Sequence, residues 1–225
     1  MIRRLLGGCC WIAAGLLMVA ELIAAVGWAG LASYDRFEPW RITISDLGAT
    51  GCAVPDSRYV DCSPFHPVLD LTLIMVGLLI IAGGLLSVVE GGPRWPVRIA
   101  RGLLVVCGLL VSAQGIIPPW NAYGPESVAL AGGTTAGALA ITLLIAIRRP
   151  EISPRRVLRV LGLIGLLGGL VFLGLVVADP PRVLSRVGGV LERIAVYPVL
   201  AGLILLGVRQ VRRPRNSLAS TAPAA

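Results

Sequence analysis

The sequence predicts an all-α fold, a polytopic transmembrane bundle of six spans with both termini in the cytoplasm. Of the 225 residues, 56% are hydrophobic and only 14% are charged, whereas a soluble domain carries about a quarter charged residues. The apolar residues are gathered in six blocks of about 20 residues, the length at which a helix crosses the roughly 30 Å core of a bilayer. Because the blocks lack the alternation of barrel strands, helices are the expected spanning elements.

The first five spans follow directly from these blocks. The block at residues 5–31 is much longer than the apolar region of a signal peptide, about 7–15 residues, so we expect a retained span. The next four predicted spans are 67–89, 97–117, 127–147 and 157–178. All of them belong to one predicted domain, residues 1–215.

The sixth span is less clear in the sequence. Residues 188–208 are long enough to cross, but they include Glu192 and Arg193. We therefore place these two charges at the outer interface, facing protein or water. The polar and alanine-rich residues 216–225 predict a disordered tail.

Glycine spacing predicts which spans are neighbours. Gly133 and Gly137 in the fourth span, and Gly165 and Gly169 in the fifth, have GxxxG spacing. Small residues at this spacing let two helix backbones approach closely. The fourth and fifth spans are therefore expected to pack against each other.

The arginine pattern predicts the orientation in the membrane. All 20 basic residues are arginine, and most lie before span 1, between spans 2 and 3, between spans 4 and 5, or after span 6. The positive-inside rule places these regions in the cytoplasm. We expect the membrane to be the plasma (inner) membrane. Anionic lipid headgroups are the expected partners of this face. No basic stripe interleaves with aromatic residues, so no nucleic-acid partner is expected.

The first external loop, residues 32–66, carries most of the extramembrane polar residues. Ser45 and Asp46 can cap a short helix, or Asp46 can bind a cation, a headgroup or Arg41. Cys52 and Cys62 face an oxidising compartment and predict a disulfide that closes part of the loop.

Two carboxylates lie within or beside the predicted spans. Glu21 lies about two-thirds of the way through the first span, where a carboxylate is either a proton- or headgroup-linked site or a structural group bonded to a neighbouring helix. Asp70 lies four residues after His66, on the same helical face. Because His66 is the only histidine, a zinc-dependent hydrolase and its metal site are not expected. No cofactor is expected either.

The candidate binding residues converge on the external half of the predicted bundle. We expect an outward-facing polar cavity there, and no assembled catalytic set. The candidates are Glu21, Ser45, Asp46, Asp70, Glu126, Glu192 and Arg193.

Three short motifs resemble those of a known family. They are Ile-Ser-Asp-Leu-Gly-Ala at 44–49, Gly-Ile-Ile-Pro at 115–118 and Gly-Val-Leu-Glu-Arg-Ile at 189–194. In this order the chain resembles domain-of-unknown-function family 998, six-span membrane proteins of bacteria and archaea. The resemblance implies the fold but no established reaction. A histidine that the family often carries after Gly-x-x-Pro is absent from residues 120–126.

Several functions remain open on these observations. The leading hypothesis is a non-enzymatic membrane protein that binds or organises lipid or another amphiphile through the outer cavity. The alternatives are a small-solute or proton-coupled transporter that uses Glu21, and a membrane enzyme that acts on a lipid-linked substrate with Asp46 or His66 as base. A protein partner or a homo-oligomer is equally compatible with the sequence.

Overall fold

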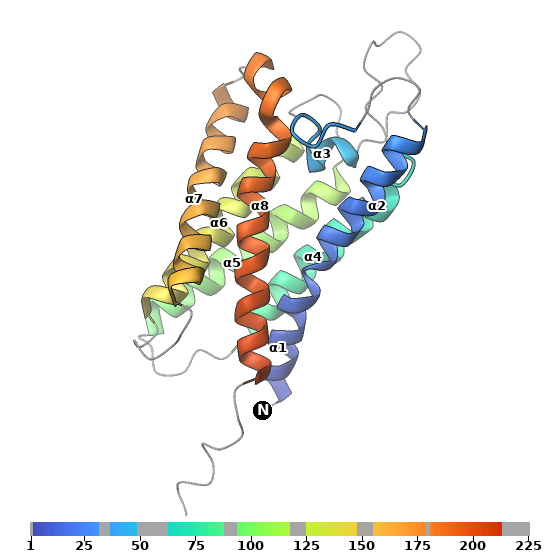
Figure 1. Ribbon diagram of the computed structural model, residues 1–225. Helices are drawn as coiled ribbons and strands as arrows, with labels where there is room; N and C mark the ends of the chain where they lie inside the picture. The colour runs from blue at the N-terminus through green and yellow to red at the C-terminus, as the bar shows by residue number, and fades with distance from the viewer. Residues whose placement is uncertain are drawn as a thin grey trace, which may run out of the picture.

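The described part of the chain is helical. The computed structural model describes residues 2–31, 37–48, 63–87, 94–117, 125–147, 155–178 and 181–212. These residues form the helices α1 (Ile2–Ala13), α2 (Leu16–Leu31), α3 (Ile44–Leu47), α4 (His66–Leu86), α5 (Arg94–Ile116), α6 (Pro125–Ile147), α7 (Arg155–Ala178) and α8 (Pro181–Arg212), and they contain no strand (Figure 1). Six segments are long and apolar enough to cross a membrane, which confirms the predicted six-span fold.

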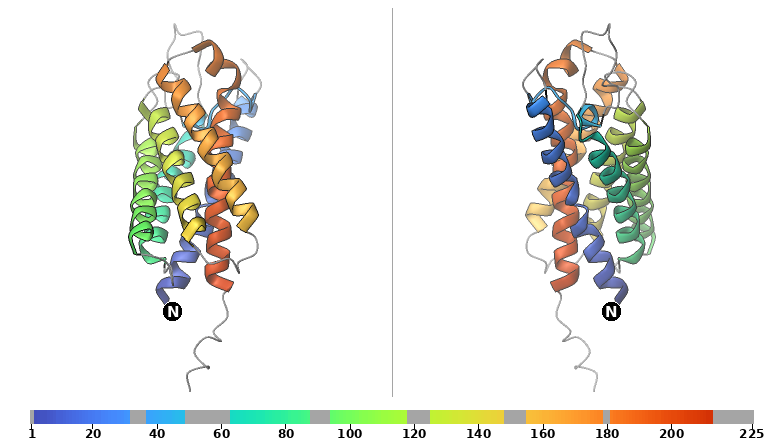
Figure 2. Two further views of the ribbon diagram at one scale, coloured as in Figure 1. Left: turned by 90° about the vertical axis from the view of Figure 1, so that its left-hand side faces the viewer. Right: turned by 90° about the vertical axis from the view of Figure 1, so that its right-hand side faces the viewer.

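The helices form one elongated, closed bundle. Each long helix packs against the next along the chain, and α8 closes the ring by packing against α1, with further contacts to α6. The two views in Figure 2 show the long helices running side by side. A Cβ on Gly8 would lie 2.8 Å from the carbonyl oxygen of Gly207, so the closing contact brings two helix backbones together with no side chain between them.

The first span is interrupted, which the sequence did not predict. The turn at Ala14 and Gly15 separates α1 from α2. The Gly15 amide donates to the carbonyl of Ile12 at 3.1 Å, and the Met18 amide donates to the carbonyl of Gly15 at 3.1 Å. These bonds span three residues rather than four, so the helix tightens locally as it passes through the break.

The predicted packing of the fourth and fifth spans is confirmed, but only the two predicted glycines of the fifth span lie at this interface. The helices α6 and α7 are neighbours. On α7, added Cβ atoms would meet α6, at 2.5 Å from the Thr135 Oγ1 for Gly169 and at 3.4 Å from the Ala138 Cβ for Gly165. The α6 glycines Gly133 and Gly137 instead lie against Cys107 of α5. The two pairs therefore serve different interfaces.

The last helix begins earlier than the sequence predicts. α8 starts at Pro181 and continues through Pro198 to Arg212, a total of 32 residues, or roughly 48 Å at 1.5 Å per residue. Proline suits the first turn of a helix because its missing amide has no intrahelical partner there. The charges in the first half of α8 lower the hydropathy, so the span appeared shorter than the helix.

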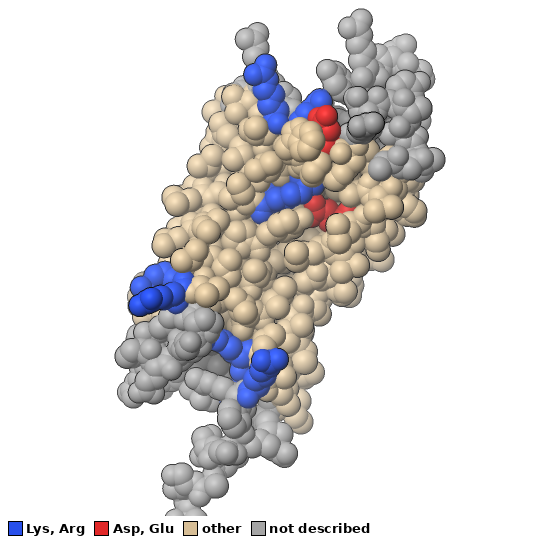
Figure 3. Space-filling model, viewed as in Figure 1, with Lys and Arg blue, Asp and Glu red and all other residues tan. Residues whose placement is uncertain are grey.

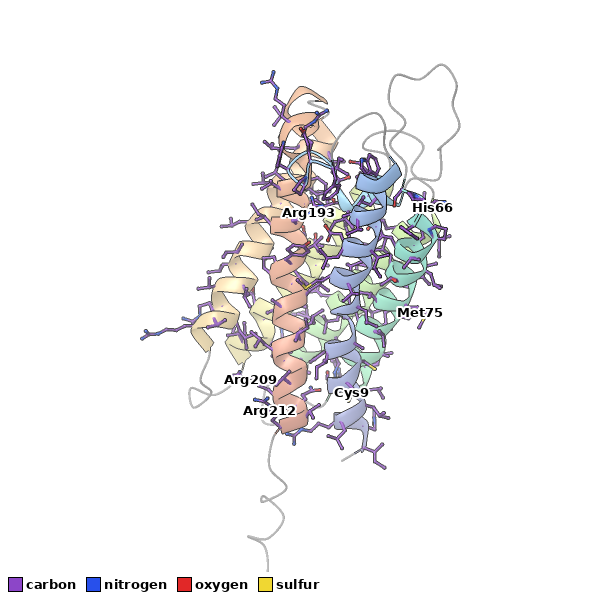
Figure 4. All side chains as sticks on the ribbon, turned by 45° about the vertical axis from the view of Figure 1, so that its right-hand side comes forward. Cys9, His66, Met75, Arg193, Arg209 and Arg212 are labelled. Carbon is purple, nitrogen blue, oxygen red and sulfur yellow. The ribbon has the colours of Figure 1, made fainter. Side chains whose placement is uncertain are left out.

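The bundle has two chemically different ends. Figure 1 shows that α1 begins and α8 ends at one end, which we call the arginine-rich end because it carries Arg3, Arg4, Arg98, Arg101, Arg209 and Arg212. The opposite end carries α3, and we call it the α3 end. Figure 4 shows Arg193 and His66 toward the α3 end, and Arg209, Arg212 and Cys9 toward the other.

Candidate functional site

Residues 37–48 build the centre of the α3 end. Their short helix α3 is capped by Thr43, whose side chain accepts from the Asp46 amide at 2.9 Å, while the Asp46 carboxylate accepts from the Thr43 amide at 2.7 Å. This reciprocal arrangement is a capping box. The N-cap residue is therefore Thr43 rather than Ser45, and Asp46 fixes the helix start.

The carboxylate of Glu192 lies at the start of α3. Its side chain comes from α8 and is completely buried, with 0% of the residue exposed. It accepts hydrogen bonds from the Ile44 amide, from the Ser45 amide at 3.4 Å and from the Ser45 hydroxyl at 2.7 Å. The first amides of a helix have no intrahelical acceptor, so Glu192 satisfies them and ties α3 to α8.

Ser45 extends this set of bonds to a third helix. Its hydroxyl accepts from the Gln114 Nε2 atom at 2.8 Å, and Gln114 lies near the end of α5. The other amide atom, Gln114 Oε1, is buried without a partner among the described residues. The chain Gln114–Ser45–Glu192 therefore links α5, α3 and α8 through side chains that are all buried.

Glu21 forms a buried ion pair with Arg193. The Arg193 Nε atom donates to Glu21 Oε1 at 2.8 Å, and Nη2 lies 2.8 Å from the same oxygen without the alignment of a hydrogen bond. The Tyr197 hydroxyl donates to the second oxygen, Oε2, at 2.7 Å. The exposed fractions of the Arg193 and Glu21 side chains are 13% and 5%. Both carboxylate oxygens of Glu21 are thus engaged by α8.

Arg193 also binds the backbone of residues 37–48. Its Nη1 atom donates to the carbonyl oxygens of Pro39 at 2.5 Å, Ile42 at 2.8 Å and Gly189 at 2.9 Å. A Cβ on Gly189 would lie 2.5 Å from each of the Pro39 and Ile42 oxygens. Gly189 therefore leaves the space in which these carbonyls reach the guanidinium. Figure 3 shows one basic and one acidic patch side by side in the middle of this face, with uncharged residues around them and other charged residues toward its two ends.

His66 and Asp70 form a third polar set, on α4. The His66 Nδ1 atom lies 3.2 Å from Asp70 Oδ2, which confirms the predicted contact one helical turn apart. A Cβ on Gly48 would lie 2.7 Å from Asp70 Oδ1, so glycine at this position lets the end of α3 approach α4. Gly48 has an ordinary φ of −88°. A glycine is therefore needed here because a side chain would collide with Asp70, and not because of the backbone conformation.

The candidate residues therefore fall into three bonded sets rather than around one polar cavity. Ser45 and Glu192 share one set, Glu21 and Arg193 another, and Asp70 belongs to the third. Glu192 and Arg193 are adjacent in sequence, yet each bonds to a different helix. Ser45 and His66 belong to separate sets, so their bonds do not assemble a nucleophile and base.

Some predicted features lie outside what the structure describes. Cys52 and Cys62, and therefore the predicted disulfide, lie outside the described residues. So does the tail at 216–225. Glu126 lies on the first turn of α6, but its side chain is outside the described part. Within the described ranges, no group of three or more His, Cys, Asp or Glu residues is placed to hold a metal ion.

An open groove lies beside the Glu21–Arg193 pair. Its volume is about 410 Å³, and it runs between α7, α8 and the residues before α3. Seven of its lining side chains are apolar or aromatic and one is charged. They are Pro39, Trp40, Ile164, Val190, Arg193, Ile194, Tyr197 and Pro198. Among the candidate residues, Arg193 lines this groove.

Sequence reasoning missed several residues that build the site. Thr43 carries a recognisable signal, because Thr-x-x-Asp at 43–46 has the spacing of a capping box. Tyr197 follows Arg193 by four residues and so shares its helical face. Trp40 and Gly189 gave no comparable signal, since their roles depend on contacts between residues 37–48 and α8.

The geometry also explains why two of the three recognised motifs belong together. The Ser-Asp-Leu-Gly segment at 45–48 and the Gly-x-x-Glu-Arg segment at 189–193 are the two halves of one bonded unit. No curated protein and no solved structure matches this chain. A family model matches residues 12–209, and the chain therefore belongs to the family described as Protein of unknown function (DUF998).

Proposed function

We propose that this multi-pass membrane protein binds one acyl chain of a membrane lipid, or a similar amphiphile, in the groove lined by Trp40, Ile164 and Pro198. The observation that carries the proposal is the groove itself, about 410 Å³ in volume and open at the side of the bundle. Small-molecule sites have volumes of roughly 300–1,000 Å³ and are mostly apolar with a few polar groups. The lining of this groove has that composition.

The surroundings of the groove favour a hydrocarbon chain. Ile164, Val190 and Ile194 are 43%, 40% and 41% exposed, and they lie on helices that contain membrane spans. An apolar groove on such a surface contacts lipid tails rather than water. The polar groups of Arg193 and Tyr197 on its wall are already bonded to Glu21, so they shape the groove without presenting an isolated charge.

Trp40 supports the position of a headgroup. Its side chain is 51% exposed and lines the groove. Tryptophan is enriched at the level of lipid headgroups because its ring is apolar and its N–H is polar. A lipid seated here would place its chain along α7 and α8 and its headgroup beside residues 37–48.

The orientation of the protein belongs to the same proposal. The start of α1 and the end of α8 lie at one end of the bundle (Figure 1), as an even number of spans requires. With the positive-inside rule, this end faces the cytoplasm of a cell whose plasma membrane holds the protein. Reporter fusions to either terminus that are active only in the cytoplasm test this orientation, and activity only outside would reverse it.

Filling the groove tests lipid binding. We expect the Ile164→Trp variant to lose most of the lipid that co-purifies with the wild-type protein, because the larger ring occupies the groove. Native mass spectrometry and lipid extraction measure the bound lipid directly. The matched control is Met75→Trp on α4, which is 49% exposed and lies away from Arg193 in Figure 4.

Two results would overturn the proposal. One is a wild-type protein that retains no lipid in a mild detergent. The other is equal lipid retention by Ile164→Trp, Met75→Trp and the wild type. A Trp40→Ala variant provides a second test, because it removes a lining side chain without adding bulk to the membrane span.

A further inference from the structure

The arginine-rich end contains buried polar atoms that have no hydrogen-bond partner among the residues that the structure describes. They are Arg4 Nη2, Trp11 Nε1, Arg101 Nε, and both Gln210 Nε2 and Gln210 Oε1. These residues come from α1, α5 and α8. Buried polar groups in proteins are almost always bonded, so a cluster of exceptions points to a missing partner.

Contacts around Gly7 and Gly8 bring these residues together. A Cβ on Gly7 would lie 3.1 Å from the Ser87 amide nitrogen, and a Cβ on Gly8 would lie 3.1 Å from the Gln210 Cβ. Arg101 Nη2 donates to the Ser87 carbonyl at 2.7 Å. Arg4 precedes Gly7 and Gly8 by three and four residues, which places it on the same face of α1.

Gln210 gives the strongest indication of a ligand. It is only 5% exposed, and neither its amide donor nor its amide acceptor is bonded within the described residues. A glutamine that packs only against apolar neighbours is destabilising compared with a leucine of similar size. An amide in this position is explained by a ligand that offers both an acceptor and a donor.

The charge of the junction defines the ligand further. Arg4 and Arg101 contribute two guanidinium groups. The acidic residues on the described parts of α1, α4, α5 and α8 are Asp70 and Glu192, and both lie at the α3 end. A negatively charged ligand therefore meets no acidic side chain on the described parts of these helices, and guanidinium groups match the geometry of phosphate oxygens.

We infer that the junction of Arg4, Arg101 and Gln210 binds a phosphate group. The two guanidinium groups and the Gln210 amide N–H donate to phosphate oxygens. Gln210 Oε1 accepts from a hydroxyl on the same ligand, either a P–OH group or an alcohol next to the phosphate ester. Both a phospholipid headgroup and free phosphate have this chemistry, and the site is separate from the groove between α7 and α8.

The first experiment measures binding and identifies the source of the phosphate. Thermal unfolding of the purified full-length protein in detergent is followed with inorganic phosphate or dioctanoyl phosphatidylglycerol, at constant ionic strength. A ligand that binds the folded state raises the unfolding temperature in a saturable way. A rise with inorganic phosphate supports a free-phosphate site, and a rise with the lipid alone supports a headgroup site. No rise with either ligand overturns the inference.

The second experiment locates the site with matched arginines. Removing one charged hydrogen-bond donor is expected to weaken binding roughly ten- to a hundredfold, so Arg4→Gln and Arg101→Gln should need that much more ligand for the same rise. The controls are Arg3→Gln and Arg98→Gln, because these neighbouring arginines are exposed. Equal weakening by all four variants would show general charge attraction and overturn the site.

A third variant keeps the test decisive if an arginine variant does not fold. Gln210→Glu preserves the size of the side chain and adds a negative charge next to the proposed phosphate. We expect it to abolish the stabilisation by ligand. An unchanged response in this variant would exclude Gln210 from the site. The groove variant Ile164→Trp should leave the response intact, which distinguishes this site from the proposed lipid groove.

Discussion

The two ends of the bundle differ in how far their buried polar groups are bonded. At the α3 end, the Glu192 carboxylate binds Ser45 of α3. The Arg193 guanidinium of α8 binds the Glu21 carboxylate of α2 and the backbone of residues 37–48. At the arginine-rich end, Arg4, Arg101 and Gln210 keep buried atoms without partners in the described structure. Among the described residues, the buried atoms without a hydrogen-bond partner at the α3 end are Trp28 Nε1, Gln114 Oε1 and Arg193 Nη2, the last of which still lies 2.8 Å from Glu21 Oε1.

This difference separates a structural role from a binding role. A polar group whose hydrogen bonds all go to other helices holds those helices in one arrangement. Separating the helices would break the bonds and leave an unpaired polar group in the low-dielectric interior, which is costly. A group with open donors gains stability only when something binds to it. The α3 end is thus expected to respond strongly to substitution, and the arginine-rich end to ligands.

The largest effect is expected for Glu192. The Glu192→Ala variant leaves the Ile44 amide, the Ser45 amide and the Ser45 hydroxyl without their acceptor, so we expect a loss of about 3–5 kcal/mol in the free energy of unfolding. Chemical unfolding of the purified protein measures it. Glu38→Ala is the control, because Glu38 forms an exposed pair with Arg41 at 3.2 Å and should cost less than about 1 kcal/mol. Similar losses for both variants would contradict the distinction.

A comparable loss is expected from breaking the Glu21–Arg193 pair. Removal of one partner from a buried pair costs about 3–5 kcal/mol, because the other charge is left uncompensated. We therefore expect Arg193→Met to be strongly destabilising and the double variant Glu21→Leu with Arg193→Met to recover part of the loss. A double-mutant cycle measures the coupling. Additive losses, with no recovery, would show that the pair itself is not the stabilising element.

A smaller loss of stability is expected at Gly189, which leaves room for the Pro39 and Ile42 carbonyls to reach Arg193. In Gly189→Ala the added methyl meets the Pro39 and Ile42 carbonyls, and overpacking of this kind costs about 1–3 kcal/mol. The control is Gly174→Ala on α7, where an added Cβ meets nothing within 4 Å. This control should be neutral or stabilising, because alanine is the better helix former. Equal unfolding temperatures for the two variants would contradict the close packing at Gly189.

The opposite sign is expected at the arginine-rich end. Without ligand, Gln210→Leu removes two buried unpartnered atoms, so we expect the unfolding free energy to rise by about 1 kcal/mol or more. The measurement uses protein that has been stripped of phosphate and lipid. A loss of stability would mean that Gln210 is already bonded in the folded protein, and the contrast between the two ends would fail.

Much of the fold was predictable because apolar block length is a local property. The blocks at 67–89 and 127–147 correspond to α4 (His66–Leu86) and α6 (Pro125–Ile147) within a few residues. The break at Gly15 and the early start of α8 at Pro181 were not predicted. The break depends on how helices contact one another and does not change the hydropathy of its block, whereas the start of α8 was missed because charged residues lower the hydropathy of its first half.

The site was predictable in its residues but not in its partners. Ser45, Glu21 and Arg193 stood out because polar groups are rare near membrane spans. Their bonds join residues that are 147 and 172 positions apart, and no local pattern specifies such pairs. The adjacent charges Glu192 and Arg193 were predicted to lie together at the outer interface, but successive residues on a helix point in different directions, so each bonds to a different helix.

The sequence by itself determined the number of spans, the family and the gathering of arginine at alternate boundaries, because these depend on composition along the chain. The tertiary structure decided that Glu192 holds α3, that Arg193 holds Glu21, and that Gln210 has no partner among the described residues. A buried polar group is stabilised or left open by whichever atoms the fold brings within about 3 Å of it. These atoms come from distant parts of the chain, so only the tertiary structure determines which polar groups are bonded at the α3 end and which lack partners at the arginine-rich end of the described structure.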